Sequence, residues 1–328
     1  MINLSTNYLG MKLKNPIIVS SCNLTDNLES IKELEANGAA AVVLRSIFEE
    51  EITMESNDFI KKAVSEGYDE GLFDYYDKKV KQNNVVQYLK LIEDAKKGVD
   101  IPVIASINCM TNQEWVYFAK KIQYAGADAL ELNMFILPSQ LDNNCQNYED
   151  LYLNIINRVL EEVSIPVTIK ISLYFSNLAS VIQKLSKTGI KGIVLFNKFF
   201  YPDFDIETEK VVPTYVLSNP QDFARPLRWI SIMSERVDCD LSASTGIHNG
   251  ESVIKLLLAG TDVVQIASTL IKNGPKHLKR MLSDIEDWME SKGYSNINDF
   301  RSKLCQCKSE NPALYERVQF MKYFGNQK

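Results

Sequence analysis

Lys170 is the residue whose place in the sequence most clearly indicates chemistry. It interrupts an otherwise apolar run that reads Thr168-Ile169-Lys170-Ile171. A lysine inside a buried strand must face a polar pocket or meet an anion, because an unpaired ammonium group is costly in an apolar interior. The alternative is a lysine that reaches solvent past the end of the strand. We favour the functional interpretation.

Uncharged polar residues end several other apolar runs of the chain. Asn108, Asn133 and Asn197 stand at three such ends, and Ser106 lies just before the first of them. An amide side chain both donates and accepts hydrogen bonds, which suits the edge of a flat heteroaromatic ring or an amide-rich substrate. Asparagine is also a common turn residue, so the group carries more weight than any one member.

Two late segments have the composition of phosphate-binding loops. One reads Ser242-Ala243-Ser244-Thr245-Gly246-Ile247 and the other Ala267-Ser268-Thr269. Small residues let backbone amides approach a phosphate, and the loops after the last two strands of a β/α barrel commonly bind one. Ordinary turn chemistry is the alternative for either loop alone. Together the two loops predict a phosphate site.

The elements that would position these residues are short buried strands preceded by helices. At four glycines an amphipathic segment ends and an apolar run begins two or three residues later: Gly38, Gly126, Gly189 and Gly260. Glycine closes a helix in the left-handed conformation, and an apolar run without alternation suits a strand buried on both faces. The eight predicted strands are Pro16–Val19, Ala40–Leu44, one opening at Ile101, Ala129–Leu132, one opening at Ile165, Gly192–Leu195, Cys239–Ala243 and Asp262–Ile266.

Eight β/α units predict an α/β fold, a closed (β/α)₈ TIM barrel. An open doubly wound sheet would often carry a glycine fingerprint after its first strand, but Ser20-Ser21-Cys22-Asn23 has none. The insertions Ile47–Asn84 and Lys198–Ala224 follow strand carboxyl ends, where we expect a lid and substrate walls. Most acidic side chains of the first insertion are expected on a solvated surface loop. Tyr294–Lys328 is predicted to wrap the barrel or support oligomerisation.

Composition and charge exclude several classes of protein. The 328 residues are 45% hydrophobic and 24% charged, with a formal net charge of -6 and a pI near 5.2. A chain of this kind is globular and lacks a basic field for a nucleic acid or an anionic membrane. We expect a cytoplasmic location, no membrane span, and one domain over residues 1–328. Six scattered cysteines and two histidines predict reduced thiols and no metal site.

The chain resembles the dihydroorotate dehydrogenase family over nearly its whole length. Leu9-Gly10-Met11-Lys12-Leu13-Lys14-Asn15-Pro16 looks like that family's opening hairpin and first strand. Glu131-Leu132-Asn133 is similar to the family's Glu-Leu-Asn, and Gln265-Ile266-Ala267-Ser268 to its Gln-Ile-Gly-Thr. The order and spacing of these segments carry the resemblance.

The resemblance implies that FMN binds across the mouth of the barrel. Its phosphate would lie near Ser244, Thr245, Gly246, Ala267 and Ser268, and its flavin ring near Ser20, Ser21, Ser106, Asn133 and Lys170. The lysine matching Lys170 sits beside the flavin's pyrimidine edge in that family, where a positive charge favours the reduced flavin anion. The residues expected to contact substrate are Arg45, Asn108, Asn133 and Asn197.

The departures from the family pattern concern the substrate and the base. Leu44-Arg45-Ser46 stands where the family has Thr-Lys-Ser, which replaces the compact ammonium group of a lysine by the planar guanidinium group of an arginine. The family's catalytic cysteine or serine falls on Ile136, which cannot take a proton, so the catalytic base is unknown. Cys109 and Cys145 could approach the pocket, although buried structural thiols are the commoner case. The family's Gly-Gly pair in the phosphate loop is matched by Thr245-Gly246.

The sequence therefore predicts an FMN-dependent oxidoreductase that moves a hydride between flavin and a small planar substrate, with a dihydropyrimidine leading. One alternative is a flavin-free barrel lyase in which Lys170 forms a Schiff base. Another is a flavoprotein subunit that has lost catalysis. The expected partner is a small molecule; a homodimer is compatible with the sequence, which names no electron acceptor.

Overall fold

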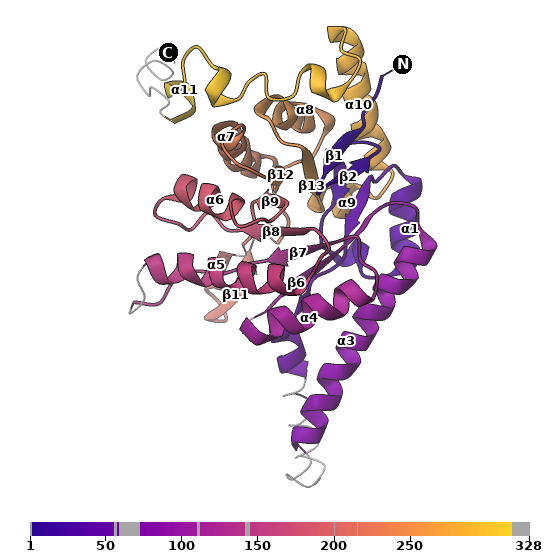
Figure 1. Ribbon diagram of the computed structural model, residues 1–328, viewed down its shortest axis with the longest axis vertical. Coiled ribbons are helices and arrows are strands. Elements are labelled where there is room, and N and C mark those ends of the chain that lie inside the picture. The colour runs from indigo at the N-terminus through magenta and orange to yellow at the C-terminus, as the bar shows by residue number, and fades with distance from the viewer. Residues whose placement is uncertain are drawn as a thin grey trace.

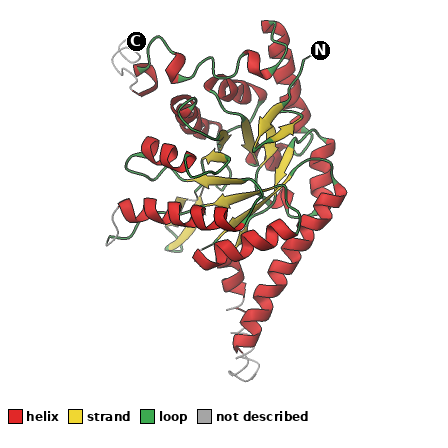
Figure 2. Cartoon of the chain, in the orientation of Figure 1, coloured by secondary structure: helices red, strands yellow, loops and turns green. Residues whose placement is uncertain are grey.

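Eight parallel strands form a closed barrel in the computed structural model (Figures 1 and 2). The structure describes residues 2–55, 58, 73–109, 112–141, 145–199, 201–214 and 216–316, without the side chains of 73–82, 112 and 145. Pairing of the first barrel strand with the last closes the circle, which confirms the predicted TIM barrel and excludes the open sheet. The barrel strands are β3 (Ile17–Val19), β4 (Ala41–Val43), β6 (Val103–Asn108), β7 (Ala129–Asn133), β8 (Val167–Ile171), β9 (Gly192–Leu195), β12 (Asp240–Ser244) and β13 (Val263–Ile266).

Helices surround the barrel because each connection between parallel strands must cross back to the starting edge. α8 is typical: the side chain of Asn249 caps its first turn by accepting from the Ser252 amide, and Gly260 ends it at φ 113°. Gly38, Gly126 and Gly189 also have positive φ, as their junctions predict. The helices are α1 (Leu28–Ala36), α3 (Phe73–Gly98), α4 (Asn112–Tyr124), α5 (Cys145–Glu162), α6 (Leu178–Ser186), α7 (Ala224–Met233), α8 (Gly250–Ala259), α9 (Ser268–Asn273), α10 (His277–Lys292) and α11 (Ala313–Glu316).

Both insertions carry regular structure that the sequence does not predict. The first contains a short strand, β5 (Ile47–Phe48), which adds to the edge of β6, and helical residues 49–55. α3 belongs to the same connection and extends well beyond the barrel in Figure 1. The second insertion folds into an antiparallel hairpin of β10 (Tyr201–Asp205) and β11 (Lys210–Thr214), followed by the 3-10 turn η3 (Pro220–Phe223).

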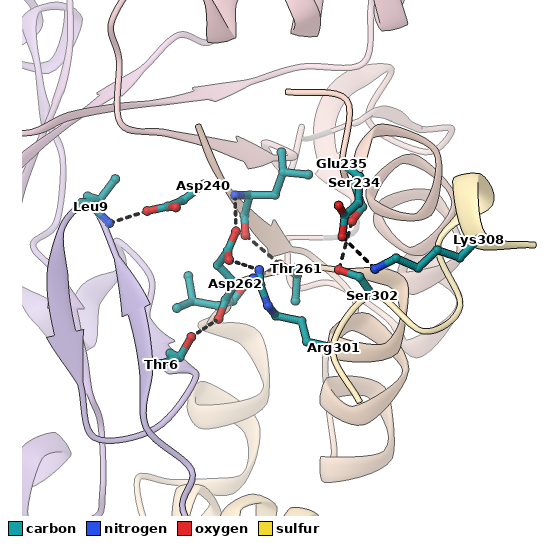
Figure 3. A network of polar contacts seen from close by, with 12 residues as sticks. Thr6, Leu9, Ser234, Glu235, Asp240, Thr261, Asp262, Arg301, Ser302 and Lys308 are labelled. Carbon is teal, nitrogen blue, oxygen red and sulfur yellow. Dashed lines mark hydrogen bonds and ion pairs between the residues drawn. The ribbon is translucent and has the colours of Figure 1, made fainter. Parts of the chain in front are cut away.

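The amino-terminal end of the barrel is covered by the hairpin of β1 (Thr6–Tyr8) and β2 (Met11–Leu13). Asp240 accepts a hydrogen bond from the Leu9 amide at 2.7 Å, which fixes this hairpin to β12 (Figure 3). Asp262, just before β13, forms an ion pair with Arg301 from the segment after α10. The carboxyl-terminal segment is thereby held against the barrel.

The segment after α10 runs over α8 and α7, as far as the structure describes it (Figure 1). The amides of Ser302 and Leu304 donate to the carbonyls of Leu257 and Leu258. It contains the remaining turns η4 (Ile297–Asp299) and η5 (Gln306–Lys308), whereas η1 (Asn23–Thr25) precedes α1. The prediction that this stretch wraps the barrel is confirmed up to residue 316, and Phe320, Tyr323 and Phe324 lie outside the described residues.

Candidate active site

A cavity of about 580 Å³ opens at the carboxyl ends of the barrel strands. This volume is within the range of roughly 300–1,000 Å³ typical of small-molecule and cofactor sites. All eight barrel strands, or the residues directly after them, contribute to its wall. Among the sequence-predicted site residues, those that line it are Ser20, Ser21, Arg45, Asn108, Asn133, Lys170, Asn197, Ser244, Thr245, Gly246, Ala267 and Ser268.

Lys170 lies in this cavity with only 8% of its surface exposed. Its Nζ donates to Ser20 Oγ at 2.9 Å and to Gln265 Oε1 at 3.2 Å. Gln265 Nε2 in turn donates to Oε2 of the fully buried Glu131 at 2.6 Å. An ammonium group has three N–H donors, so these two acceptors leave one for a ligand.

The electrostatics of this chain explain why a lysine is tolerated here. Burial lowers the pKa of Lys170, and the negative charge of Glu131 opposes that shift. Glu131 lies behind Gln265, so the carboxylate compensates the ammonium charge without occupying its remaining donor. The arrangement places a cation at the cavity wall with a free N–H.

A second group of hydroxyl and amide side chains lies around Ser46. Ser46 Oγ is 3.1 Å from Ser21 Oγ and 2.7 Å from Ser106 Oγ, and it accepts from Asn133 Nδ2 at 3.4 Å. Asn133 Oδ1 is buried without a partner among the described groups, which leaves one acceptor for a ligand. This wall is polar but uncharged.

Ser106, which is expected near the flavin ring, is not among the described residues that line the cavity. It is fully buried one layer below the wall, where it supports Ser46. Its backbone amide donates to the hydroxyl of Tyr88, and that hydroxyl donates to its carbonyl. The register explains this position, because Ser106 pairs with the interior residue Glu131 rather than with the strand end.

Asn197 follows β9 and takes part in the cavity wall. Its Nδ2 donates to the carbonyls of Met134 and Lys170, both at 3.2 Å. These bonds use the amide nitrogen and leave the amide oxygen available to a ligand. Asn108 ends β6 and also lines the cavity.

The loop after β12 has the tight backbone expected of a phosphate site. Thr245 and Gly246 both have positive φ, 84° and 79°. A Cβ on Gly246 would lie 2.1 Å from the backbone nitrogen of Phe223, so both conformation and space require glycine. Thr245 accommodates this φ while its Oγ1 donates to the Phe196 carbonyl at 3.1 Å.

Ser218 belongs to the insertion after β9 and meets this loop region across the cavity wall. Its amide donates to Ser268 Oγ at 3.0 Å, and its own Oγ lies 3.3 Å from His248 Nε2. Lys272 Nζ donates to the Ser218 carbonyl at 3.0 Å. Ser218 thus adds a hydroxyl to the wall that sequence reasoning missed.

Charged side chains stand at the entrance to the cavity. Arg45 Nη2 donates to both carboxylate oxygens of Glu51, at 3.1 and 3.3 Å, and Glu50 lines the cavity beside them. Lys198 Nζ lies 3.6 Å from Asp222 Oδ2. The acidic first insertion is therefore not only a solvated loop, because two of its carboxylates contribute to the cavity wall.

The loop after β7 turns Phe135, rather than Ile136, toward the cavity. Phe135 lines the cavity and stacks on Phe199, with ring centroids 3.9 Å apart. Ile136 is half-buried and packs against the hydrophobic core. Neither side chain can accept a proton.

The described thiols offer one candidate at the cavity that sequence reasoning did not consider. Cys22 lines the wall; burial raises its pKa, and the Lys170 charge opposes the rise. Cys109 is buried and does not line the cavity, and the side chain of Cys145 lies outside the description. Cys305 and Cys307 are 2.9 Å apart at Sγ, far along the carboxyl-terminal segment. Within the described ranges no group of three or more metal-ligating side chains could hold a metal ion.

Comparisons with known proteins agree with this geometry. The family described as dihydroorotate dehydrogenase matches residues 3–289. The catalytic subunit of dihydroorotate dehydrogenase B (NAD(+)) from Thermoplasma acidophilum is 26% identical over 312 residues, which cover 91% of this chain and 98% of that protein. Dihydroorotate dehydrogenase A (fumarate) from Lactococcus lactis subsp. cremoris is 25% identical over 334 residues, which cover 92% and 99%. The chain belongs to the dihydroorotate dehydrogenase family.

Proposed function

We propose that this protein is an FMN-dependent oxidoreductase that acts on CH–CH donors and transfers a hydride between a dihydropyrimidine-like substrate and flavin. The observation that carries the proposal is Lys170, buried at the cavity wall with one N–H free and Glu131 behind it. A cation in this place would stabilise negative charge that develops on a flat ring bound across the strand ends.

The residues present fit FMN in their donor chemistry. The unpaired Asn133 Oδ1 and the hydroxyls of Ser20 and Ser21 suit the polar edge of the isoalloxazine ring. The phosphate would lie against the loops that hold Ser244, Thr245, Gly246, Ala267 and Ser268. Bound flavin would supply the two-electron acceptor that no amino-acid side chain offers.

The chain's own residues would bind and orient the substrate. Arg45, Asn108, Asn133 and Asn197 stand around the remaining cavity space, and the amide oxygen of Asn197 is available to a ring N–H. Phe135, which stacks on Phe199, would give this side of the cavity an apolar face. We assign no catalytic base, because the family position falls on Ile136.

A purified sample distinguishes this proposal from the flavin-free lyase. We expect flavin absorbance, and FMN rather than FAD in the mass spectrum of the cofactor released on denaturation. A colourless protein that fails to bind added FMN, yet is trapped covalently at Lys170 by borohydride in the presence of a carbonyl compound, would support the lyase.

We further propose that residues 1–328 form one FMN-binding domain in the cytoplasm. None of the described helices combines the length and apolar character needed to cross a membrane. The named relatives use NAD(+) in one case and fumarate in another, so their names favour no single electron acceptor. A homodimer stays an expectation, which light scattering on the eluted holoprotein tests.

A further inference from the structure

Each of the three cations among the described residues that line the cavity has a carboxylate near it. Arg45 contacts both oxygens of Glu51, and Lys198 lies 3.6 Å from Asp222. Lys170 is compensated through Gln265 by Glu131. A substrate carboxylate entering this space would find no cation without an acidic neighbour among the described lining residues.

Glu50 adds a further negative charge on the same side. It lines the cavity from the helical residues 49–55, next to Glu51 in sequence. An anionic substrate would therefore have to displace Glu51 from Arg45 and remain close to two carboxylates. Discrimination of this kind arises from a repulsive element as much as from an attractive one.

The rest of the substrate wall is made of groups that recognise an uncharged ring. Asn133 and Asn197 offer amide oxygens as acceptors, Asn108 adds a further amide side chain, and Phe135 offers an apolar face. The ring of a cyclic ureide presents alternating N–H and C=O groups that match amide side chains. No charge on the ligand is needed to use this wall.

On the basis of the proposed function, we propose that the substrate is an uncharged dihydropyrimidine without a carboxylate. Oxidation of its ring removes a hydride from one saturated carbon, which passes to the flavin, and a proton from the neighbouring carbon, which passes to solvent. A double bond forms between the two carbons, so the products are the pyrimidine and two-electron-reduced flavin. Glu50 and Glu51 exclude the carboxylated analogue.

The test compares two substrates with the holoprotein under anaerobic conditions. We expect 5,6-dihydrouracil to bleach the flavin at least about 10-fold faster than dihydroorotate at equal concentration, because charge repulsion and competition for Arg45 act only on the second. Equilibrium titrations that follow the flavin spectrum should likewise give tighter binding for uracil than for orotate.

The variant Glu51→Gln should release Arg45 for a substrate carboxylate. We expect orotate binding to tighten by roughly 10-fold, with uracil binding changed much less. Glu235→Gln is the matched control, because Glu235 is an equally exposed carboxylate paired with Lys308 at 2.9 Å at the opposite end of the barrel. That control should leave both affinities unchanged.

The measured affinities for uracil and orotate distinguish the failure of this inference from the failure of the proposed function. Orotate binding as tight as uracil, or an unchanged preference in Glu51→Gln, would overturn the inference even if the flavin turns over. If neither dihydropyrimidine bleaches the flavin, the oxidoreductase function fails, while the two product affinities still decide whether the entrance excludes a carboxylate.

Discussion

The charge of Lys170 is the residue property on which the proposed chemistry depends most. Replacing Lys170 by Met removes a cation from the cavity wall and leaves Glu131 uncompensated behind Gln265. We expect the flavin reduction potential to fall by on the order of 50 mV, because a unit charge at about 5 Å is worth a few kcal/mol at an effective dielectric constant near 20. Equilibrium reduction against a reference dye measures the shift.

Glu131→Gln is the control for this prediction, since it removes the opposite charge from the same network. The potential should then rise, whereas a purely structural role of the network would lower FMN affinity in both variants without opposite shifts. An unchanged potential in Lys170→Met with FMN still bound would place the lysine away from the flavin.

The missing base is a second property at the scale of single residues. General-base catalysis is worth roughly 10²- to 10⁴-fold, so flavin reduction by either dihydropyrimidine should be slower than in relatives with a cysteine or serine at this position. Ile136→Cys should not restore the rate, because Ile136 packs against the core. Phe135→Cys should recover part of it, because Phe135 lines the cavity.

Stopped-flow reduction of the wild type and the two variants measures these rates. Ser46→Ala, which removes the buried hydroxyl that contacts the lining residues Ser21 and Asn133 and adds no thiol, controls for loosening of the site. Wild-type bleaching as fast as in relatives that carry the base would mean that another group takes the proton. Cys22 lines the cavity, and its thiol interacts electrostatically with Lys170, which makes it the residue to test next.

The sequence identified polar residues that interrupt an apolar run. It did not identify residues whose role depends on a hydrogen bond to a distant part of the chain. Lys170 was predictable because it is charged within a buried run. Glu131 and Gln265 are also polar residues within apolar runs, but they served only for the family resemblance and not as site residues. Ser46 and Ser218 are ordinary serines in the sequence. Their importance depends on contacts with residues that lie far along the chain, which local pattern cannot supply.

At the scale of the elements, the loop between β12 and α8 requires a glycine at position 246. Gly246→Ala combines a positive φ with a Cβ 2.1 Å from the Phe223 nitrogen. The unfavourable φ alone costs about 1–2 kcal/mol, and the contact forces the η3 turn to move as well. We expect a lower melting temperature and at least roughly 10-fold weaker FMN binding, measured by thermal shift and by fluorescence titration of the apoprotein.

Gly274→Ala is matched to Gly246→Ala in its positive φ and differs in surroundings. Its φ is 77°, close to the 79° of Gly246, but a Cβ there would meet nothing within 4 Å. This variant should lose only the conformational part of the stability and keep its FMN affinity. Equal losses of affinity in the two variants would contradict a phosphate loop at Gly246.

Most barrel strands were predictable because they are short apolar runs next to a glycine or a proline, and all eight form, including β12 with the more polar sequence Asp-Leu-Ser-Ala-Ser. The insertions were not. β5 exists because it can pair with β6, and β10 and β11 exist because they pair with each other over exposed, irregularly patterned residues. Whether such strands pair depends on the tertiary structure, and the alternation of apolar and polar residues in the sequence does not reveal it.

At the scale of the whole molecule, Asp262 and Arg301 connect the barrel to the carboxyl-terminal segment (Figure 3). Burial raises the pKa of Asp262 from its ordinary 3.8 to about 6, although Arg301 opposes the rise. The folded state therefore binds this proton more tightly than the unfolded state. The contribution of Asp262 to the free energy of unfolding is therefore most favourable at low pH. It falls, by up to on the order of 3 kcal/mol, as the pH rises from the unfolded-state pKa of Asp262 to its folded-state pKa.

Asp262→Asn removes this titration and isolates its effect. The free energy of unfolding of the wild type minus that of the variant should decrease between pH 4 and pH 7, measured by chemical denaturation of the holoprotein. Asp240, whose pKa burial also raises and whose charge helps to raise the pKa of Asp262, is present in both proteins. A difference that stays constant or increases with pH would contradict the raised pKa.

We propose above all that FMN binds in the cavity at the strand ends and accepts a hydride from a dihydropyrimidine. Anaerobic mixing of the purified protein with 5,6-dihydrouracil, followed by its visible spectrum, tests this most directly. We predict that the flavin absorbance bleaches as the corresponding pyrimidine forms in equal amount. A flavin that dithionite bleaches but no dihydropyrimidine does, or a protein that neither contains nor binds FMN, would contradict the claim.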